Sequence, residues 1–99
     1  MGMTTVLENI RKFVRMTQQR LRINLHLHVA SSALKEAPEN TEDPAMGQLR
    51  RAIRQAEARK WELEQSNLKD WGALKKRIKK ADYELLEQIR AFDKVLKTM

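Results

Sequence analysis

The sequence predicts an all-α protein, because of its composition and one long hydrophobic periodicity. Hydrophobic residues make up 41% of the 99 residues and charged residues 33%, with only 3 glycines and 2 prolines. These are too few turn residues for a many-stranded β fold, and the hydrophobic share is too high for a fully disordered chain. A chain of this length holds one domain, so we expect residues 1–99 to form a single helical domain.

The first predicted helix covers about residues 5–35. The stretch TVLE, which begins at Thr5, has the capping-box pattern of a helix start. One apolar face of this helix consists of Leu7, Ile10, Val14, Leu21 and Leu25, flanked by Val6 and Phe13. A second apolar stripe, on nearly the opposite side, consists of Ile23, Leu27, Ala30 and Leu34. A helix that is apolar on both sides is expected to be buried on both sides.

Residues 21–29, LRINLHLHV, also alternate between apolar and polar side chains. Such alternation is typical of a half-buried strand. A strand needs a pairing partner, and we find no second alternating segment in this chain. We therefore favour a helix, with a strand that pairs with another molecule as the alternative. Both interpretations predict that this segment is buried in an assembly.

An acidic linker is predicted at residues 36–44, EAPENTEDP, which contains both prolines and no basic residue. Asp43 is a good N-cap, because its side chain can accept hydrogen bonds from backbone N–H groups at a helix start. Pro44 suits the first helical position. A second helix should therefore begin at Pro44.

The second half of the chain has an apolar stripe at helical spacing. Its members are Leu49, Ile53, Ala56, Lys60, Leu63, Asn67, Trp71, Leu74, Ile78, Ala81, Leu85, Ile89, Phe92 and Leu96. The stripe keeps its phase across residues 66–72, SNLKDWG, which favours one helix over about 44–97 and hence a helical hairpin with a long second helix. The alternative is a three-helix bundle with a break near 66–72. A single helix of this length would reach about 80 Å, so part of its stripe would need another chain.

These faces predict a protein–protein interaction module, such as an adaptor, a chaperone or an assembly subunit. It would act by burying apolar helix faces against a second copy or a partner protein. Trp61 and Leu68 lie off the main stripe and are expected to form an exposed flank, because Trp is enriched at the centres of interfaces. The predicted partner interface consists of Leu21, Ile23, Leu25, Leu27, Trp61, Leu68, Ile78, Leu85, Ile89 and Phe92.

The charge of the chain predicts an alternative function, that of a basic helical nucleic-acid-binding protein. The net charge is +7, and a basic surface attracts anionic partners. Two clusters supply the candidate anion or nucleic-acid contacts: Arg50, Arg51 and Arg54, and then Lys75, Lys76, Arg77, Lys79 and Lys80. The ordinary interpretation of both clusters is a solvated helix face.

The sequence predicts no enzyme, no cofactor and no small-molecule substrate. The acidic residues do not form a paired-carboxylate, Ser-His or Gly-rich-loop arrangement, and there is no cysteine. His26 and His28 would point about 200° apart on a helix, so they could not share a metal ion.

No apolar run approaches the roughly 20 residues of a membrane span, and the first residues lack the apolar core of a signal peptide. We therefore expect a cytoplasmic, intracellular protein without a membrane span.

Overall fold

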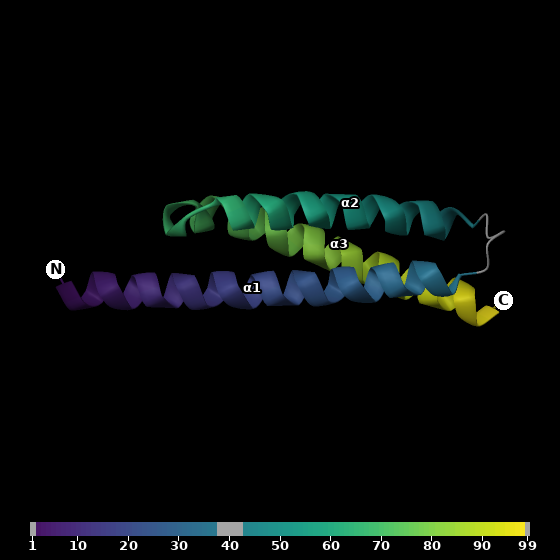
Figure 1. Ribbon diagram of the computed structural model, residues 1–99, viewed down its shortest axis with the longest axis horizontal. Helices are drawn as coiled ribbons and strands as arrows, with labels where there is room; N and C mark the ends of the chain where they lie inside the picture. Colours follow the sequence, from purple (N-terminus) through teal and green to yellow (C-terminus); the bar gives the residue numbers. More distant parts are fainter. Residues whose placement is uncertain (1, 38–42, 99) are drawn as a thin grey trace.

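Three helices run up, down and up along the long axis of the protein in the computed structural model, which describes residues 2–37 and 43–98 (Figure 1). They are α1 (Gly2–Glu36), α2 (Pro44–Gln65) and α3 (Trp71–Thr98), with a short 3-10 helix, η1 (Leu68–Asp70), before α3. The molecule is elongated, with extents of 60 × 18 × 16 Å. The all-α fold expected from the sequence is confirmed, and the described residues form no strand.

α1 continues through residues 21–29 as a regular helix, so the strand interpretation of that stretch is wrong for this chain. A helix satisfies its backbone groups internally, whereas a lone strand would leave them unpaired. The helix ends at Glu36, one residue beyond the predicted end. It begins at Gly2 rather than at the predicted Thr5, so the capping-box pattern lies inside the helix.

α2 begins where the sequence predicts. Asp43 has an extended backbone, and its Oδ1 accepts a hydrogen bond from the Ala45 N–H at 2.8 Å. Pro44 follows at the start of the helix, where its missing N–H would have no intrahelical partner anyway. The middle of the predicted linker, residues 38–42, lies outside the described residues.

The chain reverses direction at Ser66 and Asn67, so the three-helix alternative describes the fold and a single helix over 44–97 does not. Both residues have extended backbones. Asn67 then caps the next turn: its Oδ1 accepts from the Lys69 N–H at 2.9 Å, and its own N–H donates to Asp70 Oδ2 at 3.2 Å. The Ser66 hydroxyl donates to the Leu63 carbonyl at 2.8 Å and closes the end of α2.

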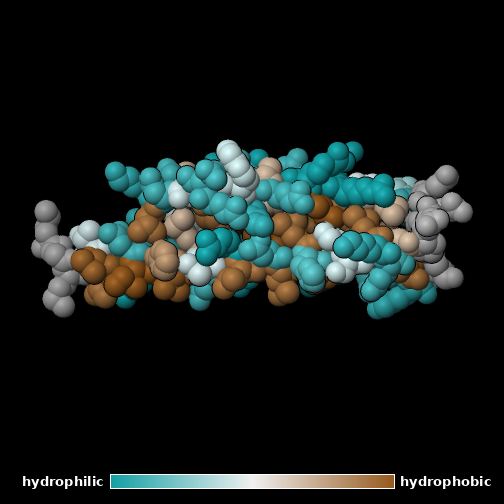
Figure 2. Space-filling model, viewed as in Figure 1, coloured by the Kyte–Doolittle hydropathy of each residue, from teal (hydrophilic) through white to brown (hydrophobic). Residues whose placement is uncertain are grey.

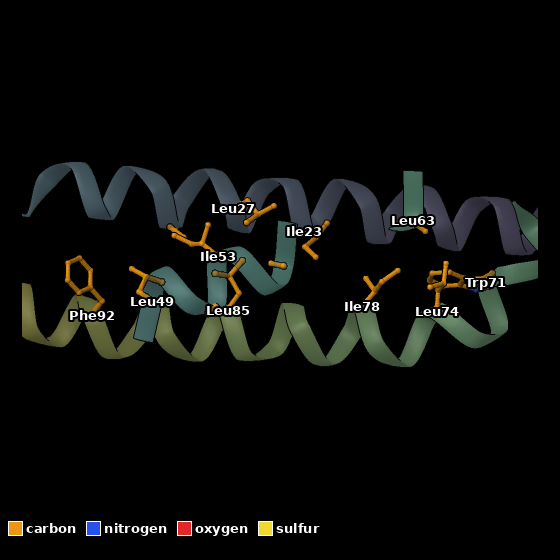
Figure 3. Close-up of a cluster of buried hydrophobic side chains, with 13 residues drawn as sticks. Ile23, Leu27, Leu49, Ile53, Leu63, Trp71, Leu74, Ile78, Leu85 and Phe92 are labelled. Atoms are coloured by element: carbon orange, nitrogen blue, oxygen red, sulfur yellow. The ribbon is translucent and has the colours of Figure 1, made fainter. Parts of the chain in front are cut away.

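The reversal brings the two halves of the long stripe together, with α1 laid against both (Figure 1). Leu49 of α2 lies near Phe92 of α3 at one end of the core, and Leu63 lies near Trp71 at the other (Figure 3). From α1, the core takes Ile23, Leu27 and Ala30. Each arm presents an apolar residue to this core every three or four positions.

A polar contact also joins α1 to α3. His26 Nδ1 lies 2.6 Å from Asp82 Oδ1, and Asp82 is buried. A buried carboxylate without a partner would destabilise the fold, so this contact favours one register of α1 along α3. His28, two residues on, is exposed.

Two Leu→Ala substitutions should differ in their effect on stability, one in the core and one on the outer side of α1. Leu85 is fully buried, so Leu85→Ala should lower the free energy of unfolding by about 2–5 kcal/mol. Leu21 is exposed, so Leu21→Ala should change it by no more than about 0.5 kcal/mol. Urea denaturation of dilute protein measures both, and similar losses in the two variants would contradict the described burial.

Candidate interaction surface

α1 carries an apolar face that the rest of the bundle does not cover. We call it the outer stripe and define it as Leu7, Ile10, Val14, Leu21 and Leu25. Its exposed fractions run from 44% at Val14 to 61% at Leu21. Val6, Phe13 and Val29 beside it are also exposed. Most of the exposed large hydrophobic side chains of the described residues therefore lie on this single helix.

The outer stripe extends beyond the bundle at the N-terminal end of α1. Here α1 projects past the turn between α2 and α3 (Figure 1). Every residue from 5 to 15 is exposed. Figure 2 shows hydrophobic side chains gathered along α1, most densely toward this end. Apart from Phe13, which lines a hollow with Leu63 and Leu68, the large apolar side chains of residues 5–15 are left exposed, so another molecule could cover them.

The structure divides the predicted partner interface between the core and the surface. Leu21, Leu25 and Trp61 are exposed, whereas Ile89 and Leu68 are half-buried. The other five are buried within the chain: Ile23, Leu27, Ile78, Leu85 and Phe92. Those five pack against one another's helices, so in this fold they cannot contact a partner (Figure 3).

Leu7, Ile10 and Val14, which the sequence places on one face of the helix with Leu21, are exposed together with it. The spacing of these residues was a sufficient signal.

Trp61 and Leu68 do not form the continuous flank that was expected. Trp61 is 62% exposed and lines a shallow groove with Asn24 and His28 of α1. Leu68 follows the chain reversal and lines a different hollow, with Phe13 and Leu63. The break at Ser66 and Asn67 moves Leu68 off α2, which explains the difference.

The two basic clusters stay on separate helices. Arg50, Arg51 and Arg54 are exposed on α2. The side chains of the cluster at residues 75–80 lie on different flanks of α3, because successive residues of a helix point about 100° apart. Lys75 and Lys79 line a groove beside α1. Arg77 lies on the other flank, where its Nη1 is 3.7 Å from Glu62 Oε2.

Lys80 and Glu84 line a further groove on the same flank as Arg77. Lys76 is exposed. The 75–80 tract is therefore not one patch. Arg77 is paired with Glu62 of α2, whereas Lys75 and Lys79 face α1.

Within residues 2–37 and 43–98, no three His, Cys, Asp or Glu side chains are grouped as a metal site requires. His26 instead contacts Asp82, and His28 points elsewhere. None of the helices built from the described residues combines the length and the apolar character needed to cross a membrane.

Comparisons of the chain with protein families, with curated proteins and with solved structures found no match. Its own surfaces therefore carry the functional argument.

Tryptophan fluorescence should distinguish the exposed indole of Trp61 from the buried indole of Trp71. Trp61 is 62% exposed and Trp71 only 4%. Trp71→Phe should leave a protein whose fluorescence acrylamide quenches readily, because the remaining indole faces water. Trp61→Phe should leave a blue-shifted emission that resists acrylamide. Equal quenching in the two variants would contradict the described placement of Trp71 in the core.

Proposed function

We propose that the protein is a helical protein–protein interaction module, an assembly subunit that associates with a second copy of itself through the outer stripe. The proposal rests on one observation, the difference in burial between the two apolar faces. The 49–96 stripe is largely buried within the chain, whereas the outer stripe is left in water. Contiguous exposed apolar patches of this kind mark interaction sites in soluble proteins.

A second copy fits the outer stripe because four of its five residues are placed symmetrically along the helix; the position symmetric to Leu7 is His28. The midpoint of these four residues lies between Thr17 and Gln18. Val14 and Leu21 are equally far from that midpoint, and so are Ile10 and Leu25. Two antiparallel α1 helices would therefore bring Val14 of one copy to Leu21 of the other, and Ile10 to Leu25. A surface that matches itself in this way suits a two-fold dimer.

The position of the stripe leaves room for this pairing. The core-facing residues of α1, such as Ile23 and Leu27, lie on nearly the opposite side of the helix from Leu21 and Leu25. The two bundles of a dimer would thus lie on opposite sides of the paired helices. The 35 residues of α1 span about 52 Å. Pairing along this length offers the extended contact that an interface of standard size, about 800 Å² on each partner, requires.

The charges beside the stripe oppose this pairing and give it a distinctive salt dependence. Arg11 and Arg22 lie on one flank of α1, eleven residues or about three turns apart. In the antiparallel dimer, Arg11 of one copy approaches Arg22 of the second copy. Because salt screens this repulsion while the apolar contacts persist, self-association should strengthen as salt rises.

Molar mass by light scattering on a sizing column at about 0.5 M salt tests the proposal. The wild-type protein should give twice the chain mass of 11.6 kDa. Leu21→Asp should give the monomer mass, because it would bury a carboxylate near the two-fold axis. Ala58→Asp is the matched control: it adds the same charge at an exposed position of α2 and should leave the dimer intact.

A wild-type monomer at all salt concentrations, or a dimer that survives Leu21→Asp, would contradict self-association through the outer stripe. A stripe that is free in such a monomer would then be a surface for a different protein.

Oxidative cross-linking tests the antiparallel orientation, since the chain has no native cysteine. Gln18→Cys lies next to the proposed two-fold axis and should cross-link readily. Leu7→Cys should not, because its counterpart would lie at the far end of the partner helix. Ready cross-linking of Leu7→Cys would instead indicate parallel helices, in which equivalent residues lie side by side along the whole stripe.

A further inference from the structure

A groove between α1 and α3 gathers positive charge on the side of α1 that adjoins the outer stripe. It has a volume of about 460 Å³. Its lining residues are Arg15, Gln18, Gln19 and Arg22 of α1, and Trp71, Lys75 and Lys79 of α3. Four of these seven side chains are cationic, and no carboxylate of the described residues is among them.

Helical spacing explains why these cations converge. Lys75 and Lys79 are four residues apart, so they project from the same flank of α3. Arg15 and Arg22 are seven residues apart, about two turns, and share the flank of α1 that faces them. Like charges held together repel one another, and in the described part of the chain none of the four has a carboxylate within ion-pair distance.

The floor of the groove contains a second, independent sign of a missing ligand. Gln19 is only 5% exposed, and its Nε2 has no hydrogen-bond partner. A buried donor without an acceptor destabilises a fold, so such a group needs an explanation. Gln19 lines the groove, and a rotation of its side chain would let this amide donate to an anion seated among the four cations.

We infer that the groove binds a phosphate-rich polyanion, through phosphate groups held by Arg15, Arg22, Lys75 and Lys79. Arginine forms bidentate hydrogen bonds with phosphate, and lysine adds compact point charges. Trp71 is buried beneath the groove and offers no face on which a base could stack. Recognition is therefore through phosphate charge, which either a short polyphosphate or the backbone of a single-stranded nucleic acid supplies. This inference does not depend on the proposed self-association.

Two charge-matched variants test the groove. Arg15→Gln/Arg22→Gln/Lys79→Gln removes three charges from it, and Arg50→Gln/Arg51→Gln/Arg54→Gln removes three from α2. All six side chains are exposed, so both variants should fold. The probes are a fluorescein-labelled 20-nucleotide oligothymidylate, followed by anisotropy, and inorganic tripolyphosphate, followed by calorimetry and by competition.

At about 50 mM salt the groove variant should bind at least tenfold more weakly than the wild type, and the α2 variant within about threefold of it. The salt dependence of oligothymidylate binding should also fall, by about 2 in the slope of log affinity against log salt. Binding of both probes in competition would show that a short polyphosphate suffices. Binding of the oligothymidylate alone would identify the nucleic-acid backbone as the ligand.

Three results would overturn the inference: equal losses in the two variants, a loss in the α2 variant alone, or no binding of either probe at low salt. Gln19→Met tests the role of the buried amide without changing the charge of the groove. It should raise Tm, because it removes the unpaired amide, while it weakens binding several-fold. Unchanged affinity in this variant would contradict the role of the groove floor.

Discussion

The reversal of the chain at Ser66 and Asn67 is the constraint on which the rest of the structure depends. It folds the two halves of one long apolar stripe onto each other, so that residues from Leu49 to Phe92 form a core within a single chain. The local cost is small, because the Asn67–Asp70 capping box and the Ser66 hydroxyl supply partners for backbone groups at the helix ends. In exchange, the large side chains of the stripe leave water, each contributing about 1.5–3 kcal/mol.

Because α2 and α3 pack against each other, only one face of α1 contacts the core. Ile23, Leu27 and Ala30 complete the bundle, and the outer stripe on the other side is left without a partner in the chain. The proposed function follows from this surplus of apolar surface. The groove beside α3 has a separate physical origin, since it depends on concentrated charge. Salt should therefore strengthen association through the stripe and weaken binding in the groove, which distinguishes the two although Arg22 lies beside both.

Much of the fold could be predicted from local signals in the sequence. Asp43 and Pro44 mark the start of α2, because capping and proline geometry depend on neighbouring residues alone. The two-sided character of α1 was also visible in its spacing. The turn at Asn67 was ambiguous, because capping residues also occur within helices and the stripe keeps its phase across them. Only the gain from burying one half of the stripe against the other decides between the two arrangements.

The sites were less predictable, because they depend on which helix faces meet. Helical spacing separates Leu21 from Ile23, but it does not say which of the two faces packs inside the chain; Leu21 is exposed and Ile23 is buried. The 75–80 tract was treated as one cluster, yet its members face different neighbours. Gln19 gave no signal at all, since a glutamine in a helix is unremarkable until packing buries it.

The distance between spin labels at Arg50→Cys and Lys94→Cys tests the chain reversal most directly. Both positions are exposed, and the chain has no other cysteine to label. Neighbouring helix axes lie about 8–10 Å apart, so pulsed electron paramagnetic resonance should give a short distance, lengthened only by the label arms and the width of the helices. Dilution with unlabelled protein removes distances between copies. A continuous helix would instead separate the two positions by about 65 Å, and that result would contradict the three-helix fold.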